Sequence, residues 1–145
     1  MDITLRYKGG KQFEASARGH YLVSDQPLDD QGADAGMTPP ELFLASIAAC
    51  AGYYAAEYLN ARNLPSEELE IRAKALKGGK PARMVSINLD VIAPGLNKRH
   101  RDGVLRAVDA CLLKNTLHFP PEIDVHVQSS VAEEKVEVGS EVFVG

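Results

Sequence analysis

A long apolar helix that begins near Thr38 is the feature that most constrains this fold. Thr38-Pro39-Pro40-Glu41 is a typical helix start: Thr caps well, Pro is tolerated in the first turn, and Glu can complete a capping box. We expect the helix to end near Arg62. Its first half is apolar almost all round, which predicts a central helix buried on most faces. One small domain buries such a helix with difficulty, so the sequence also predicts a homodimer.

Short strands are expected on both sides of this helix. Alternating apolar residues and turn signals predict strands over 3–8, 12–17, 20–24, 69–77, 84–93, 123–128 and, at the end of the chain, 131–144. A loop is expected over 25–36, and a second helix from Lys98 to Leu113 followed by a cap at Asn115-Thr116. Strands joined by short turns pair antiparallel, so the predicted class is α+β in a single domain, residues 1–145.

Composition narrows the possible functions. The chain has 145 residues, a formal net charge of -4 and 45% hydrophobic residues, which is ordinary for a soluble protein. A mildly acidic chain without a basic stripe argues against nucleic acid as a partner. The strongly apolar stretch Leu42 to Ala51 is too short to span a bilayer, and the N-terminus carries no signal sequence, so we expect a cytoplasmic protein and no membrane partner.

Two cysteines, Cys50 and Cys111, are the candidate functional centre. Structural disulfides are rare in the cytoplasm, so the pair is either redox-active or simply two small buried hydrophobic residues. Cys50 is placed about three turns into the first helix and Cys111 in the last turn of the second, where the helix dipole disfavours a thiolate. This asymmetry favours Cys50 as the attacking thiol and Cys111 as the resolving one. The spacing carries no metal signature, and no cofactor is expected.

Two segments around these cysteines resemble the OsmC/Ohr family of osmotically inducible and organic hydroperoxide resistance proteins. Residues 36–50, Gly-Met-Thr-Pro-Pro-Glu-Leu-Phe-Leu-Ala-Ser-Ile-Ala-Ala-Cys, are similar to the family's helix entry, which ends in Ala-Ala-Cys. Residues 106–117, Arg-Ala-Val-Asp-Ala-Cys-Leu-Leu-Lys-Asn-Thr-Leu, resemble its second-cysteine helix. The order of elements agrees from Met1 to about Val127, in what looks like a divergent OsmC-like branch.

The resemblance implies an OsmC-like fold with antiparallel sheets on two central helices in an intertwined homodimer. It also implies a thiol-dependent peroxidase of oxidative stress defence, whose substrate is a small organic hydroperoxide. One cysteine becomes a sulfenic acid, the second closes a disulfide, and an external dithiol reduces it. In the family an Arg and a Glu hold the attacking thiolate in its active state.

The match departs from the family at the activating carboxylate. Aligned on Cys50, the family's Glu falls at Pro40, and Glu41 lies one residue later, about 100° around the helix. Glu41 therefore cannot simply inherit the role of the family's Glu; it is a candidate catalytic residue whose alternative role is the capping box. Arg18 is the candidate partner of the thiolate, and its alternative is a solvated turn residue. The loss of Glu leaves a second function open: a non-catalytic, small-molecule-binding or stress-associated dimer.

Three aromatic residues are candidates for a substrate pocket. Tyr53 and Tyr54 follow Cys50 by about one turn and could line an apolar pocket for a hydroperoxide tail, or they could belong to the buried core. Phe43, two turns before Cys50, is the third candidate.

Overall fold

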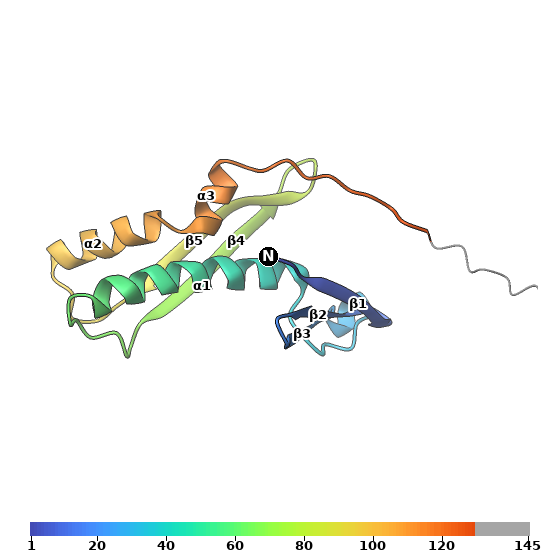
Figure 1. Ribbon diagram of the computed structural model, residues 1–145, viewed down its shortest axis with the longest axis horizontal. Coiled ribbons are helices and arrows are strands. Elements are labelled where there is room, and N and C mark those ends of the chain that lie inside the picture. Colours follow the sequence, from blue (N-terminus) through green and yellow to red (C-terminus); the bar gives the residue numbers. More distant parts are fainter. Residues whose placement is uncertain (130–145) are drawn as a thin grey trace, which may run out of the picture.

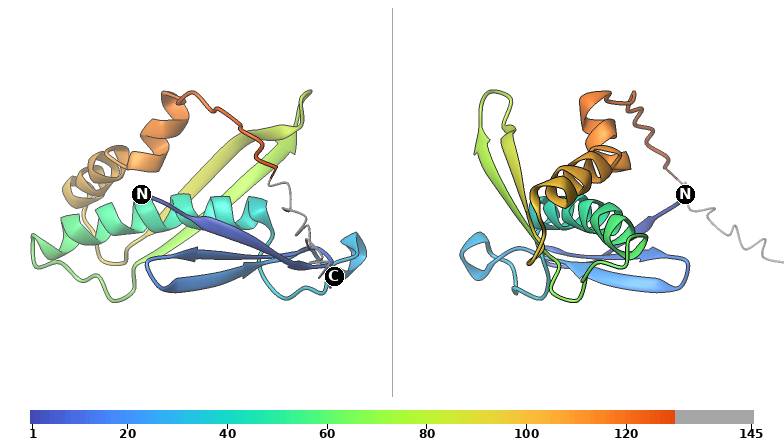
Figure 2. Two further views of the ribbon diagram at one scale, coloured as in Figure 1. Left: turned by 45° about the vertical axis from the view of Figure 1, so that its right-hand side comes forward. Right: turned by 90° about the vertical axis from the view of Figure 1, so that its left-hand side faces the viewer.

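The computed structural model describes residues 1–129 and has two antiparallel sheets and three α-helices (Figure 1). The elements in chain order are β1 (Thr4–Gly9), β2 (Gln12–Ala17), β3 (His20–Ser24), the 3-10 helix η1 (Leu28–Asp30), α1 (Pro39–Asn60), β4 (Glu70–Gly78), β5 (Arg83–Ile92), α2 (Lys98–Asp109) and α3 (Leu112–His118). The strands from β1 to β3 form one sheet, and β4 pairs with β5 in the other. The views in Figure 2 show α1 between the three-stranded sheet and the other two helices. The predicted α+β class is confirmed.

The strands expected before α1 are formed, and the sequence between β2 and β3 favours a tight turn. Ala17 pairs with His20, so Arg18 and Gly19 form a two-residue hairpin turn. Their φ angles are 52° and 82°, the positive values that type I′ hairpin turns require. Alternation predicts β2 and β3 at their observed bounds, and β1, β4 and β5 within one residue of theirs.

The predicted start of α1 is confirmed as a capping box. The Thr38 hydroxyl accepts a hydrogen bond from the Glu41 backbone N–H at 3.4 Å, and the Glu41 carboxylate accepts one from the Thr38 N–H at 2.8 Å. The helix has 22 residues, enough by length and composition alone to cross a membrane, a test that the core helix of a soluble protein also passes.

Among residues 1–129, one stripe of α1 is buried, so the single chain does not by itself bury the helix on most faces. The stripe is Ile47, Ala51, Ala55 and Leu59, spaced four residues apart. Ala51, Ala55 and Leu59 form the core together with Val104 and Val108 of α2. On another side, Gly52 lies so close to β4 that an added Cβ would come within 3.3 Å of Ile71. Small residues thus allow elements on two sides to approach α1 closely.

The predicted second helix is divided in two. Helix α2 ends at Asp109, and α3 begins at Leu112, with Cys111 as its N-cap residue at ψ 123°. The expected continuation to Leu113 and the cap at Asn115-Thr116 were therefore wrong. Thr116 lies inside α3, where its hydroxyl donates to the Leu112 carbonyl at 2.9 Å.

The strand expected over 123–128 is not formed. Residues 120–129 are extended and leave the body of the molecule (Figure 1). The alternating residues Ile123, Val125 and Val127 are 83%, 82% and 93% exposed, because this segment has no strand pairing with β1–β5 in the single chain. The strand expected over 131–144 lies outside the described residues.

A buried carboxylate organises the loop that leads into α1. Asp25 is 1% exposed and accepts hydrogen bonds from the backbone N–H groups of Gln26, Ala33 and Ala35 and from the Gln12 side chain, at 2.8–3.2 Å. Burial alone would raise the pKa of Asp25, but these four donors together outweigh it and lower the pKa below its ordinary value. The loop is therefore folded around the negatively charged carboxylate of Asp25.

We predict that Asp25→Asn lowers Tm by at least about 5 °C at pH 7, because an amide nitrogen would face backbone donors that need an acceptor. The depressed pKa contributes stability above the unfolded-state value of about 3.9, and that contribution is lost as the pH falls through the folded value. The Tm gap between the two proteins should thus narrow below about pH 4. Thermal unfolding monitored by circular dichroism checks both results. Asp34→Asn is the matched control, since Asp34 is exposed in the same loop. An equal loss of Tm in both variants would contradict this role of Asp25.

Candidate functional site

The two cysteines, separated by 60 intervening positions in the sequence, meet in the structure. Cys50 lies midway along α1 and Cys111 at the junction that precedes α3, and the two thiols are neighbours, because Cys50 adds to the effect of burial in raising the pKa of Cys111. Cys111 is fully buried and Cys50 is half-buried, and both are free thiols. Packing of α3 against α1 therefore places two oxidisable sulfur atoms side by side, with one of them partly open to solvent.

The environment of Cys111 favours its protonated form. Burial and the neighbouring Cys50 thiol raise the pKa of the Cys111 thiol, while the backbone N–H groups of Lys114 and Leu113 oppose the rise. Because Cys111 precedes α3 rather than ending α2, the helix-end argument made from the sequence was wrong for this residue. The pKa of Cys111 is nevertheless raised, as the helix-end argument expected, but the main cause is burial.

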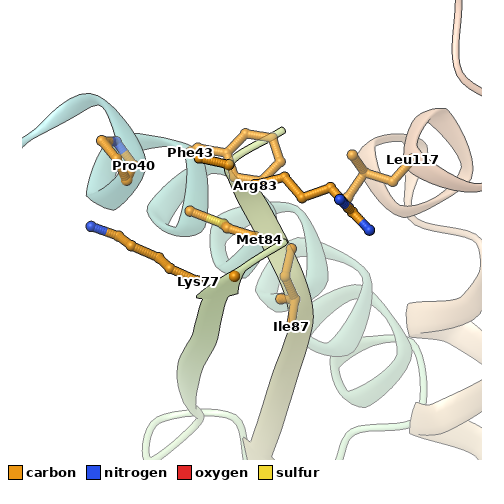
Figure 3. Close-up of a pocket in the computed structure, with 9 residues that line it drawn as sticks. Pro40, Phe43, Lys77, Arg83, Met84, Ile87 and Leu117 are labelled. Atoms are coloured by element: carbon orange, nitrogen blue, oxygen red, sulfur yellow. The ribbon is translucent and has the colours of Figure 1, made fainter. Parts of the chain in front are cut away.

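An apolar groove runs along β5 beside the thiol pair. A first cavity of about 560 Å³ is lined by residues of α1, β4, β5 and α3, among them Phe43, Met84, Ile87 and Leu117 (Figure 3). A second cavity of about 640 Å³ shares the last three of these residues, so the two are continuous.

Neither cysteine lines the second cavity, but a neighbour of each in the sequence does. It is lined by Ile47, which lies three residues before Cys50 on α1, and by Lys114, which lies three residues after Cys111. On a helix this spacing puts side chains on neighbouring positions of one face, so Ile47 is adjacent to Cys50. The wall of the second cavity therefore includes a neighbour of Cys50 on α1.

The charged candidates Arg18 and Glu41 lie in other settings. Arg18 is exposed in the turn between β2 and β3, and within residues 1–129 its side chain forms no hydrogen bond or ion pair. Glu41 is engaged in the capping box, and the hydrogen bonds from Thr38 lower its pKa. The catalytic roles suggested for these two residues stay predictions, while the alternative role of each matches its position in the single chain.

The aromatic candidates divide between the groove and the surface of α1. Phe43 lines the first cavity together with Pro40 (Figure 3). Tyr53 is 62% exposed and packs edge-on against Tyr54, with ring centroids 5.4 Å apart. Neither tyrosine lines the two cavities of the groove.

Sequence reasoning missed the other residues of the groove wall. Arg83 and Met84 belong to no recognisable motif, and Leu117 ends the segment that resembles the family's second-cysteine helix. Only the alternation along β5 marks part of this wall as apolar. Among residues 1–129 no three His, Cys, Asp or Glu side chains are grouped closely enough to hold a metal ion. The described arrangement is thus suited to thiol chemistry beside an apolar surface.

Comparisons with known proteins agree with this arrangement. The OsmC-like protein family matches residues 31–126. Among solved structures, the OsmC-like protein of Mycoplasma pneumoniae is 19% identical with a TM-score of 0.68, over 81% of this chain and 86% of that one. An organic hydroperoxide resistance protein OsmC of Legionella pneumophila is 17% identical with a TM-score of 0.62, over 80% and 87%.

A third solved structure, the organic hydroperoxide resistance protein OhrB of Bacillus subtilis, is 20% identical with a TM-score of 0.56, over 79% of this chain and 88% of that one. No match was found among curated proteins. The solved structures share the fold, and the family match covers most of the chain and both cysteines. The chain therefore belongs to the OsmC-like protein family.

Proposed function

We propose that this protein is a thiol-dependent peroxidase that reduces small organic hydroperoxides, with Cys50 as the peroxidatic and Cys111 as the resolving cysteine. The observation that carries the proposal is the proximity of the two thiols, one within α1 and the other at the N-cap of α3. The names of related structures, two of them organic hydroperoxide resistance proteins, support the substrate class. The groove beside the pair supplies an apolar surface for an alkyl substituent.

The cycle has three balanced steps. The Cys50 thiolate attacks one peroxide oxygen, the O–O bond breaks, and the leaving alkoxide takes a proton to become an alcohol, which leaves Cys50 as a sulfenic acid. The Cys111 thiolate then attacks the Cys50 sulfur, and hydroxide departs as water when it is protonated. An external dithiol reduces the resulting disulfide and is itself oxidised to a disulfide.

The burial difference supports this division of roles. Cys50 is the half-buried thiol and so is the one a hydroperoxide can reach, whereas Cys111 is fully buried. The raised pKa of Cys111 keeps its proton in place while Cys50 reacts. Cys111 then needs only to lose that proton to attack a sulfur already in contact with it.

We predict that Cys50→Ser lowers hydroperoxide consumption to the rate of free cysteine. Cys111→Ser should consume one equivalent of an alkyl hydroperoxide and stop at a sulfenic acid, because no second thiol is in contact with Cys50. Stopped-flow kinetics and mass spectrometry of the trapped sulfenic acid measure the two results. Equal rates for Cys50→Ser and the unchanged protein would exclude Cys50 as the attacking residue.

The raised pKa of Cys111 predicts a pH-dependent second step. Below its pKa, the thiolate fraction rises about tenfold for each pH unit, so disulfide closure should be about tenfold faster at pH 8 than at pH 7. The measurement is the rate at which the disulfide forms after one equivalent of hydroperoxide has been consumed. Cys111→Ser is the control and should form no intramolecular disulfide at either pH. A closure rate that does not change over this range would show that Cys111 is already ionised at pH 7.

The second candidate function is a non-catalytic, small-molecule-binding dimer. It is favoured by Pro40 at the position of the family's Glu and by the absence, within residues 1–129, of any ion pair that involves Arg18. On this alternative the groove along β5 would hold an apolar ligand that survives native mass spectrometry. Retention of such a ligand together with hydroperoxide consumption no faster than that of free cysteine would favour it over the peroxidase.

We further propose that the working unit is a cytoplasmic homodimer. Alternating Ile123, Val125 and Val127 are exposed in the extended segment, as a strand would be before it pairs with a second chain. Tyr53 and one whole face of α1 are also uncovered. Large exposed apolar surfaces of this kind are typical of protein interfaces.

The dimer predicts a solution mass of twice 15.7 kDa in size-exclusion chromatography with light scattering. Val125→Glu should shift the protein toward the monomer, since it puts a charge on the apolar side of the expected strand. His126→Glu, on the opposite side, is the matched control and should leave the dimer intact. A monomer at micromolar concentration for the unchanged protein would contradict the proposal.

A further inference from the structure

A basic hollow lies between the end of α1 and the first half of α2, away from the groove. It has a volume of about 360 Å³, within the range of small-ligand sites. Its lining includes Arg62, which follows the end of α1, and Arg99, His100 and Arg106 of α2, with Tyr58 of α1 beside them. Three exposed arginines, one just beyond α1 and two on α2, thus line one small hollow on a protein whose formal net charge is -4.

Carboxylates of the described chain do not neutralise these arginines. None of the four ion pairs within residues 1–129 includes Arg62, Arg99 or Arg106. The nearby carboxylate of Asp102 forms an ion pair with Lys98 instead, at 2.8 Å. The first turn of α2 carries no acidic residue, so its basic side chains add to the positive end of the helix dipole. These exposed basic side chains are therefore available to a bound anion.

The arginine that follows α1 is held in place before any ligand binds. The Arg62 guanidinium lies 3.8 Å from the centre of the Tyr58 ring, and its Nη1 donates to the Tyr58 carbonyl at 3.2 Å. A hydrogen bond of 3.3 Å joins the Tyr58 hydroxyl to Nδ1 of His100. Gly103 is buried against the same ring and leaves no room for a Cβ there. A fixed side chain loses less conformational entropy on binding than a free one.

We propose that this hollow binds the phosphate group of a small anionic molecule, either free phosphate or a phosphate ester. Guanidinium groups offer paired donors that match phosphate oxygens, and they stay charged at every physiological pH. The hollow is large enough for one or two phosphate groups with a small substituent. Tyr58 lies eight residues beyond Cys50, about 12 Å along α1, so the site is separate from the thiol pair and does not rest on the proposed peroxidase activity.

The test uses the full chain with orthophosphate and pyrophosphate as probes, at an ionic strength held constant with sodium chloride. Isothermal titration calorimetry should detect binding of both, with pyrophosphate the tighter if a phosphate ester is the occupant and the two equal if it is free phosphate. Arg99→Gln and Arg106→Gln should each weaken binding at least about tenfold, since each removes a charged hydrogen-bond donor. Arg106→Lys keeps the charge but loses the paired donors, so it should bind more weakly than the unchanged protein.

Arg101→Gln is the matched control, because Arg101 is exposed on the same helix, carries the same charge and does not line the hollow. It should change affinity by less than about twofold. Cys50→Ser should bind phosphate normally, which separates this site from the thiol chemistry. Equal losses in Arg101→Gln and Arg106→Gln would overturn the proposal in favour of general charge attraction. No binding by the unchanged protein, or equal heat from chloride alone, would also overturn it.

Discussion

Close packing of α1 against its neighbours sets the positions of both candidate sites. Ala51 and Ala55 are fully buried at the contact with α2, and their small side chains let the two helices approach. The same approach carries α3 onto α1, where Cys111 meets Cys50. At its far end it brings Arg62 beside Arg106. A larger residue at Ala51 or Ala55 would separate the helices and so disturb both places at once.

The small residues that permit this approach also limit how much apolar area one chain buries. Leu59 is the largest fully buried apolar side chain, and burial of such a residue contributes only about 1.5–3 kcal/mol. The three-stranded sheet leaves Ile3, Leu5 and Tyr7 largely exposed. Such a chain gains much from covering its apolar surfaces with a second copy, which is the physical basis for expecting a dimer.

Much of the fold could be predicted from local sequence signals, whereas contacts between residues far apart in the sequence could not. Alternation and turn residues predicted the strands, and Thr38 with Glu41 predicted the start of α1. The break at Ala110 and Cys111 has neither Gly nor Pro to mark it, so one helix was expected where two exist. Apolar residues around α1 suggested burial on most faces, because the sequence does not distinguish a surface covered within the chain from one left open for another copy.

The candidate site was likewise predictable in its local features and not in its long-range contacts. The family resemblance singled out the two cysteines, but their contact depends on how α3 packs and could not be read from a long separation in sequence. Residues of the groove such as Met84 and Leu117 come from separate elements and form a wall only after folding. The basic start of α2 was visible in the sequence, yet only the fold brings Arg62 to it.

Because the expected second helix is divided in two, the short helix α3 connects Cys111 to the wall of the groove. Cys111 lies at one end of α3, just before Leu112, and Leu117 on the same seven-residue helix forms part of both cavities of the groove. A rigid helix moves as one body, and the non-helical backbone at Cys111 gives it a pivot. Within the proposed cycle, any turn of α3 that accompanies a change in the bonding of the Cys111 sulfur would therefore also move Leu117 in the wall of the groove.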